Sequence, residues 1–228
     1  MESMGRSYSV IRATWLTRKP HPRAWFITTW SVIFLILCSV LFWQNYFSAS
    51  QWMTSSKQEV FYNGQLWRLW TSLFAHGDLA HLASNSLLFF IFGYFLSGYF
   101  GVFVFPFLAI LLGGLTNALT VMTYAPDMKL IGISGVVYWM GGMWLVLYLL
   151  LDVQRTVFQR ALRSFGVALA VFFPSTAFDP QISYKAHFIG FILGILSGFI
   201  YYKINEAKFK AAVRTELIIE PEEEVKTF

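Results

Sequence analysis

Four polar side chains, set in otherwise apolar stretches of this sequence, have the residue types needed for acyl-transfer chemistry. Ser134 lies in the motif Gly-Ile-Ser-Gly, and a serine hydroxyl becomes a nucleophile when a base removes its proton. His187 could be that base, because histidine is the commonest general base in enzymes. His81 and Asn85 are four residues apart, so on a helix they share one face.

Each of these side chains also has a purely structural interpretation. A serine in a membrane helix commonly bonds back to a carbonyl of its own helix or packs as a small residue. A single histidine can be satisfied by a neighbouring carbonyl, and Asn85 could hydrogen-bond one helix to another. A functional site is favoured only if the fold brings the four residues to one place.

The elements that would position these residues are membrane helices. Of the 228 residues, 57% are apolar and 13% are charged, whereas soluble domains are about 45–50% apolar and about 25% charged. These values exclude a disordered chain and an ordinary soluble domain. Apolar stretches predict helices at residues 24–43, 79–98, 102–124, 132–151, 164–173 and 186–202, and Asp78 is a candidate cap of the second. The sequence therefore predicts an all-α fold, a polytopic membrane bundle of six transmembrane helices.

The stretches between and beyond these helices suggest a simple organisation. Residues 1–23 would be a cytoplasmic N-terminal segment, residues 24–202 the membrane domain, and residues 203–228 a cytoplasmic tail, helical at first, then frayed, and acidic at its end. Within the membrane domain, residues 44–77 interleave aromatic and polar side chains. That composition suits the headgroup layer, so we expect a structured interfacial loop there.

The basic residues predict the orientation of the chain. With both termini in the cytoplasm, thirteen of the 17 Lys and Arg residues fall in inner segments and four in outer ones, Lys57, Arg68, Lys129 and Lys185. This bias follows the positive-inside rule. The basic pI near 9.3 therefore needs no nucleic-acid partner, and we expect a multi-pass protein, of the bacterial plasma membrane in our interpretation.

Alternating topology places the four polar residues near the outer surface. The helices at 79–98, 132–151 and 186–202 all run from outside to inside, and the residues lie near their outer ends. Gly190, Gly194 and Gly198 form a small-xxx-small ladder on the face that carries His187. Ser134, Tyr138 and Gly141 form the matching stripe on the helix at 132–151. Packing of the two glycine faces without any chemistry stays open at this step.

These motifs resemble those of the rhomboid intramembrane serine proteases. The resemblance rests on Trp67-Arg68, on the run from Phe74 to Asn85 with His76 and His81, and on Gly132-Ile133-Ser134-Gly135 with Tyr138. It continues with Ala186-His187-Phe188-Ile189-Gly190 and covers roughly residues 24–202. The chain looks like the minimal six-helix form. It departs from the family at Ser97, where many members carry an acidic residue, and this departure is expected to affect the packing of that region.

The resemblance implies a serine endopeptidase that cleaves transmembrane helices of membrane proteins near their outer ends. Ser134 and His187 would form a catalytic dyad, because no Asp or Glu is expected at the depth of His187, and Tyr138 would pack against its imidazole. The Ser134 N–H, His81 and Asn85 would bind the oxyanion, and Gly132 would allow the turn before Ser134. Supporting positions are His76, Trp67, Arg68, Gly190 and Gly194.

The implied reaction needs no cofactor and no metal, and the single Cys38 offers neither an intramolecular disulfide nor a thiolate cluster. The implied partners are transmembrane substrates and the lipid bilayer. The sequence leaves the oligomeric state open. The helix at 164–173 is the shortest and lacks obvious polar anchors, so we expect it to be the mobile wall through which substrate enters.

Two other function classes account for part of the pattern. His81 and His187 could ligate haem b or contact a quinone, which leaves Ser134 and Asn85 without a role. The site formed by these residues could instead belong to a chaperone that binds membrane helices without cleaving them. Labelling of the serine by a fluorophosphonate, a Soret band, or a retained effect of Ser134→Ala would separate the three.

Overall fold

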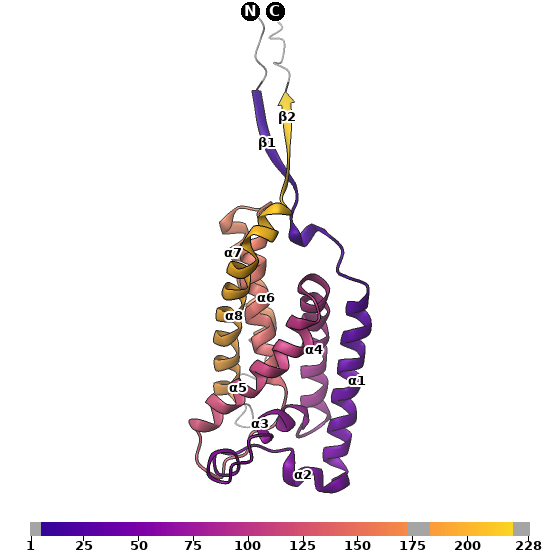
Figure 1. Ribbon diagram of the computed structural model, residues 1–228, viewed down its shortest axis with the longest axis vertical. Helices are drawn as coiled ribbons and strands as arrows, with labels where there is room; N and C mark the ends of the chain where they lie inside the picture. The colour runs from indigo at the N-terminus through magenta and orange to yellow at the C-terminus, as the bar shows by residue number, and fades with distance from the viewer. Residues whose placement is uncertain (1–5, 173–182, 221–228) are drawn as a thin grey trace, which may run out of the picture.

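The computed structural model describes residues 6–172 and 183–220. Long helices run side by side and carry a set of short helices at one end and a two-stranded sheet at the other (Figure 1). The long helices are α1 (Arg23–Trp43), α4 (Leu79–Phe100), α5 (Ala109–Met122), α6 (Ser134–Leu151), α7 (Val157–Phe172) and α8 (Tyr184–Ala211). The short ones are η1 (Trp15–Thr17), η2 (Tyr46–Ser48), α2 (Ala49–Trp52), η3 (Gln58–Tyr62), α3 (Arg68–Thr71), η4 (Ser72–Phe74) and η5 (Phe103–Leu108).

The predicted helices are present, with shifted ends. α1 and α4 begin within one residue of their predicted starts, and Asp78 caps α4 as expected by accepting a hydrogen bond from the His81 amide at 2.8 Å. The predicted helix at 102–124 is kinked within η5, where Phe105 has non-helical backbone angles and Pro106 offers no amide hydrogen; α5 follows directly. The last helix, α8, continues nine residues beyond the predicted end at residue 202.

In the described part of the chain, five helical segments are long and apolar enough to cross a membrane. They are α1, α4, η5 with α5 (Phe103–Met122), α6 and α8. The helix predicted at 164–173 corresponds to α7, which begins earlier, at Val157. Residues 173–182, which include the last residue of that predicted helix, lie outside the described residues. The chain is thus a polytopic membrane protein, and its sixth crossing stays a prediction.

The two ends of the chain form a sheet that the all-α prediction missed. Strand β1 (Arg6–Ala13) pairs antiparallel with β2 (Arg214–Glu220), and Ser9 lies opposite Leu217. Arg12 and Glu216 form an ion pair across the strands at 2.6 Å. Both strands project from the same end of the bundle, opposite α2 and α3 (Figure 1). This places Arg6 and Glu220, the first and last described residues, on one side of the membrane domain, as the predicted six crossings would.

Helix α6 is the centre of the bundle. Trp139, Met140, Met143 and Leu147 on this helix are fully buried. Its longest contact is with α8, and it also packs against α4, α5 and α7. Among the candidate spans of the described residues, α6 is therefore the one most enclosed by the rest of the protein.

Candidate active site

The backbone turns sharply just before Ser134. Gly132 has a φ of +103°, a conformation that favours glycine, and its amide donates to the Ser72 carbonyl at 2.9 Å. Ser134 follows as the first residue of α6 and is partly buried. The first amides of a helix have no partner within the helix, so this turn leaves N–H donors beside the serine hydroxyl. This hydrogen bond thus joins the turn to η4, which belongs to the first loop (residues 44–77).

Helix α8 lies so close to α6 that side chains are excluded along the contact. A Cβ on Gly190 would lie 2.2 Å from the Gly135 carbonyl oxygen, and one on Gly194 would lie 2.2 Å from that of Trp139. On the opposite side of the contact, Gly142, next to the predicted Gly141, approaches the Phe191 carbonyl oxygen, where a Cβ would lie at 2.5 Å. The predicted glycine ladder therefore brings two backbones together.

The close approach places His187 against α6. Its imidazole stacks on the ring of Tyr138, with centroids 4.0 Å apart and planes 12° apart. A Cβ on Gly135 would lie 3.6 Å from the carbonyl oxygen of Ala186, the residue before His187. Ser134 and His187 thus begin neighbouring helices at the same end of the bundle. A second ring, that of Tyr184, lies edge-on to the imidazole with centroids 6.2 Å apart, and no sequence motif pointed to it.

His81 completes this arrangement from α4. A Cβ on Gly132 would lie 2.9 Å from Cε1 of His81, so the imidazole lies against the turn that precedes Ser134. Asn85, one turn further along α4, is buried, and its Nδ2 has no hydrogen-bond partner in the described part of the chain. A buried amide donor with no partner is costly, and a functional ligand is one explanation of such a group. The structure therefore brings the four predicted residues to the same end of the bundle, on three helices.

His76 is a buried link between α1 and this region. Its Nδ1 lies 2.9 Å from Oγ of Ser39, which also donates to the Phe74 carbonyl, and its ring lies 5.0 Å from that of His81. Burial and, secondarily, the nearby His81 lower the pKa of His76 to about 3, so this imidazole is neutral at physiological pH. The family resemblance includes His76 as a supporting position, but nothing local in the sequence points to Ser39 as its partner.

Arg68 organises the first loop. Its buried guanidinium donates to the carbonyls of Gln51 and Thr54 at 2.7 and 2.9 Å, and Glu59 lies 3.5 Å away. It is therefore a structural residue of the loop, with its charge compensated within the loop. The neighbouring Trp67 is more than half exposed, at 53%, on the loop surface.

Ser97, which departs from the family pattern, is buried near the inner end of α4. Its hydroxyl donates to the Gly93 carbonyl of its own helix at 2.6 Å. This local bond satisfies the side chain without a charged partner, so the position is compatible with a neutral residue.

Between residues 6 and 172 and between 183 and 220, no group of three or more His, Cys, Asp or Glu residues is arranged to hold a metal ion.

A known protein family matches the part of the chain that carries the candidate active site. A family model described as the Rhomboid domain matches residues 63–204, which include α4, α5, α6 and α7 and most of α8. A comparison with curated proteins finds no match for the chain.

Proposed function

The chain belongs to the rhomboid family of intramembrane serine proteases, and we propose that it is an active endopeptidase with a dyad of Ser134 and His187. The observation that carries this proposal is the stacking of His187 on Tyr138 at 4.0 Å, one turn along α6 from Ser134. The family acts on transmembrane proteins in the bilayer, and we propose that this chain cleaves its substrates near their outer ends.

In the proposed reaction, His187 removes the proton from Ser134 as the hydroxyl attacks the scissile carbonyl. The carbonyl oxygen becomes an oxyanion, which the Ser134 amide, the His81 imidazole and the Asn85 amide can stabilise by hydrogen bonds. His187 then gives its proton to the leaving amine, and water hydrolyses the acyl-enzyme with His187 again acting as the base. The unpaired Nδ2 of Asn85 supports the oxyanion role, since it is a donor without a ground-state partner.

Tyr138 takes the place of an acidic residue in orienting the base. A flat ring stacked on the imidazole at an angle of 12° restricts the rotation of His187. The carboxylate of Asp78 lies near the site, but it caps α4 by accepting a hydrogen bond from the His81 backbone amide. The arrangement supports a dyad in preference to a Ser-His-Asp triad.

Substrate entry past α7 is consistent with how that helix packs. α7 contacts chiefly α6, and its large apolar side chains Val157, Phe158, Leu162 and Phe165 are exposed. The sequence suggested no polar anchor for this helix, but its earlier start includes Arg160, which donates to the Leu149 carbonyl. We therefore propose that the inner end of α7 is fixed and that its outer part moves to admit a substrate helix.

Labelling by a fluorophosphonate tests the activity directly. The purified wild-type protein in liposomes should form a covalent adduct at Ser134, because the probe reacts with serines that a base activates. Ser134→Ala should remove the adduct, whereas Ser84→Ala should retain it, since Ser84 is exposed and bonds only to its own helix. A folded wild-type protein that never reacts, or one with a Soret band, would contradict the protease assignment.

Asn85→Ala should lower kcat far more than it changes KM. Loss of one oxyanion donor costs about 10²–10³ in rate, since the bond is stronger in the transition state than in the bound substrate. Cleavage kinetics of a model transmembrane substrate would measure the split. Asn205→Ala is the matched control, because this amide bonds the Tyr201 carbonyl at the inner end of α8. A rise in KM with an unchanged kcat would argue for substrate binding instead.

A further inference from the structure

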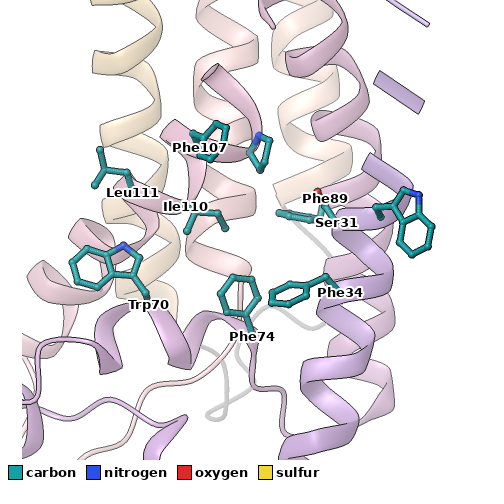
Figure 2. Close-up of a pocket in the computed structure, with 10 residues that line it drawn as sticks. Ser31, Phe34, Trp70, Phe74, Phe89, Phe107, Ile110 and Leu111 are labelled. Atoms are coloured by element: carbon teal, nitrogen blue, oxygen red, sulfur yellow. The ribbon is translucent and has the colours of Figure 1, made fainter. Parts of the chain in front are cut away.

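A cavity separate from the candidate active site opens on the side of the bundle between α1 and α5. It has a volume of about 610 Å³ and includes none of Ser134, His187, His81 and Asn85 among its lining residues. Phe34 projects into it from α1, Phe107 and Ile110 project from the other side, and Trp70 and Phe74 close its outer end (Figure 2). Cavities of about 300–1,000 Å³ are the size that small ligands occupy.

The lining of this cavity offers few polar groups, one hydroxyl and the indole N–H groups of Trp30 and Trp70. Its one hydroxyl, that of Ser31, donates to the Ile27 carbonyl of the same helix at 2.9 Å. The indole of Trp70 lies against Gly114, where a Cβ would be 2.4 Å from its ring nitrogen. Aromatic and aliphatic carbons provide nearly all of the remaining surface, so the occupant must be apolar.

The cavity is continuous with the surface that faces lipid. α1 and the segment Phe103–Met122 both qualify as membrane spans, and the cavity lies between them. Its rim residues Trp30, Phe34, Phe107 and Leu111 are 53–66% exposed and belong to the apolar exterior of these spans. The cavity thus opens to the bilayer, and if it were empty its lining would lose the dispersion contacts that lipid provides elsewhere.

We propose that this cavity is a binding site for one acyl chain of a membrane lipid. The alternative apolar occupant, a helix of another protein, does not fit the volume. A helix about 10–12 Å across that rises about 5.4 Å per turn fills roughly 400–600 Å³ per turn, so the cavity holds about one turn. A flexible acyl chain enters such a space from the lipid without unwinding.

The bound chain would support the segment that holds the active-site turn. Phe74, at the outer end of the cavity, packs edge-on against Phe34 with centroids 5.2 Å apart, and its carbonyl accepts from Ser39. Ser72, two residues earlier, accepts the hydrogen bond from the Gly132 amide. The acyl chain would therefore lie directly beneath η4, the element to which the turn before Ser134 is tied. The binding site itself does not depend on catalytic activity.

Photolabelling in vesicles tests this site. The protein would be reconstituted in phosphatidylcholine that carries a diazirine within one acyl chain, irradiated, digested and analysed by mass spectrometry. We expect the labelling of Phe34, Phe107 and Leu111 to exceed by about tenfold that of Leu87 and Leu196, which are similarly exposed on α4 and α8. Equal labelling at all five residues would overturn the proposal, because it would show ordinary annular lipid.

A matched pair of variants on α5 tests whether the excess photolabelling comes from the cavity. Leu111→Trp places an indole at the rim of the cavity and should reduce the excess labelling of Phe34 and Phe107 to the level of Leu87. Leu115→Trp makes the same change one turn along the helix, at an exposed residue outside the cavity lining, and should leave the labelling unchanged. Because both leucines are exposed, both variants are expected to fold. Undiminished labelling in Leu111→Trp, or cavity residues protected below Leu87 in the wild type, would overturn the proposal.

Discussion

Alanine at position 134 should abolish cleavage of a transmembrane substrate, and alanine at position 187 should do nearly the same. Without the hydroxyl there is no nucleophile, and without the imidazole the hydroxyl keeps its proton at neutral pH. Serine hydrolases lose on the order of 10⁴–10⁶ in kcat when the nucleophile or base is removed. Cleavage of a tagged single-span substrate in liposomes, followed over time on gels, measures this loss.

The double variant distinguishes a dyad from two independent contributions. Residues that act as one unit are strongly non-additive, so Ser134→Ala with His187→Ala should be no slower than either single variant. Independent roles would instead multiply the two losses. Ser84→Ala controls for removal of a hydroxyl near the outer surface, because Ser84 is exposed and donates only to the His81 carbonyl at 3.1 Å. Substantial cleavage by folded Ser134→Ala would contradict the assigned nucleophile.

The sequence could predict those features that local rules and a single periodicity determine. Asp78 was predicted as the cap of α4 because a short acidic side chain just before an apolar run has that role. The spacing of Gly190, Gly194 and Gly198 predicted a close helix contact, because residues four apart share a face. His187 followed from its position on that same face. The roles of these residues in catalysis stay proposals.

The remaining features depend on contacts between distant parts of the chain. Nothing local relates Ser39 to His76, although their side chains lie 2.9 Å apart. The strands of the terminal sheet are separated by about 200 residues, and the alternation within β2 is weak because Ile218 and Ile219 are adjacent. Periodicity also cannot distinguish Gly141 from Gly142, since adjacent residues differ by only about 100° around a helix.

Alanine substitutions at Gly194 and Gly198 should mainly lower stability, whereas the substitution at Gly190, nearest to His187, should lower both stability and activity. Gly190→Ala places a Cβ 2.2 Å from the Gly135 carbonyl oxygen, and Gly194→Ala places one 2.2 Å from that of Trp139. Both atoms belong to helix backbone, so α6 and α8 must separate, at a typical cost of about 1–3 kcal/mol. Gly198→Ala should cost less, because its Cβ would lie 3.0 Å from the Met143 carbonyl oxygen.

The Gly190→Ala and Gly194→Ala variants create equally close contacts but should differ in their loss of activity. Gly190 is one turn from His187, so separating the helices there also moves the imidazole from Ser134, and a shift of about 1 Å can cost about 10² in rate. Gly194→Ala acts one turn further from the site and should retain more activity at the same loss of stability. Thermal unfolding and kcat of the three variants measure these differences. Gly166→Ala on α7 is the control, because no atom lies within 4 Å of its added Cβ. Equal losses of activity in the Gly190 and Gly194 variants would mean that the contact acts on the site only through overall stability.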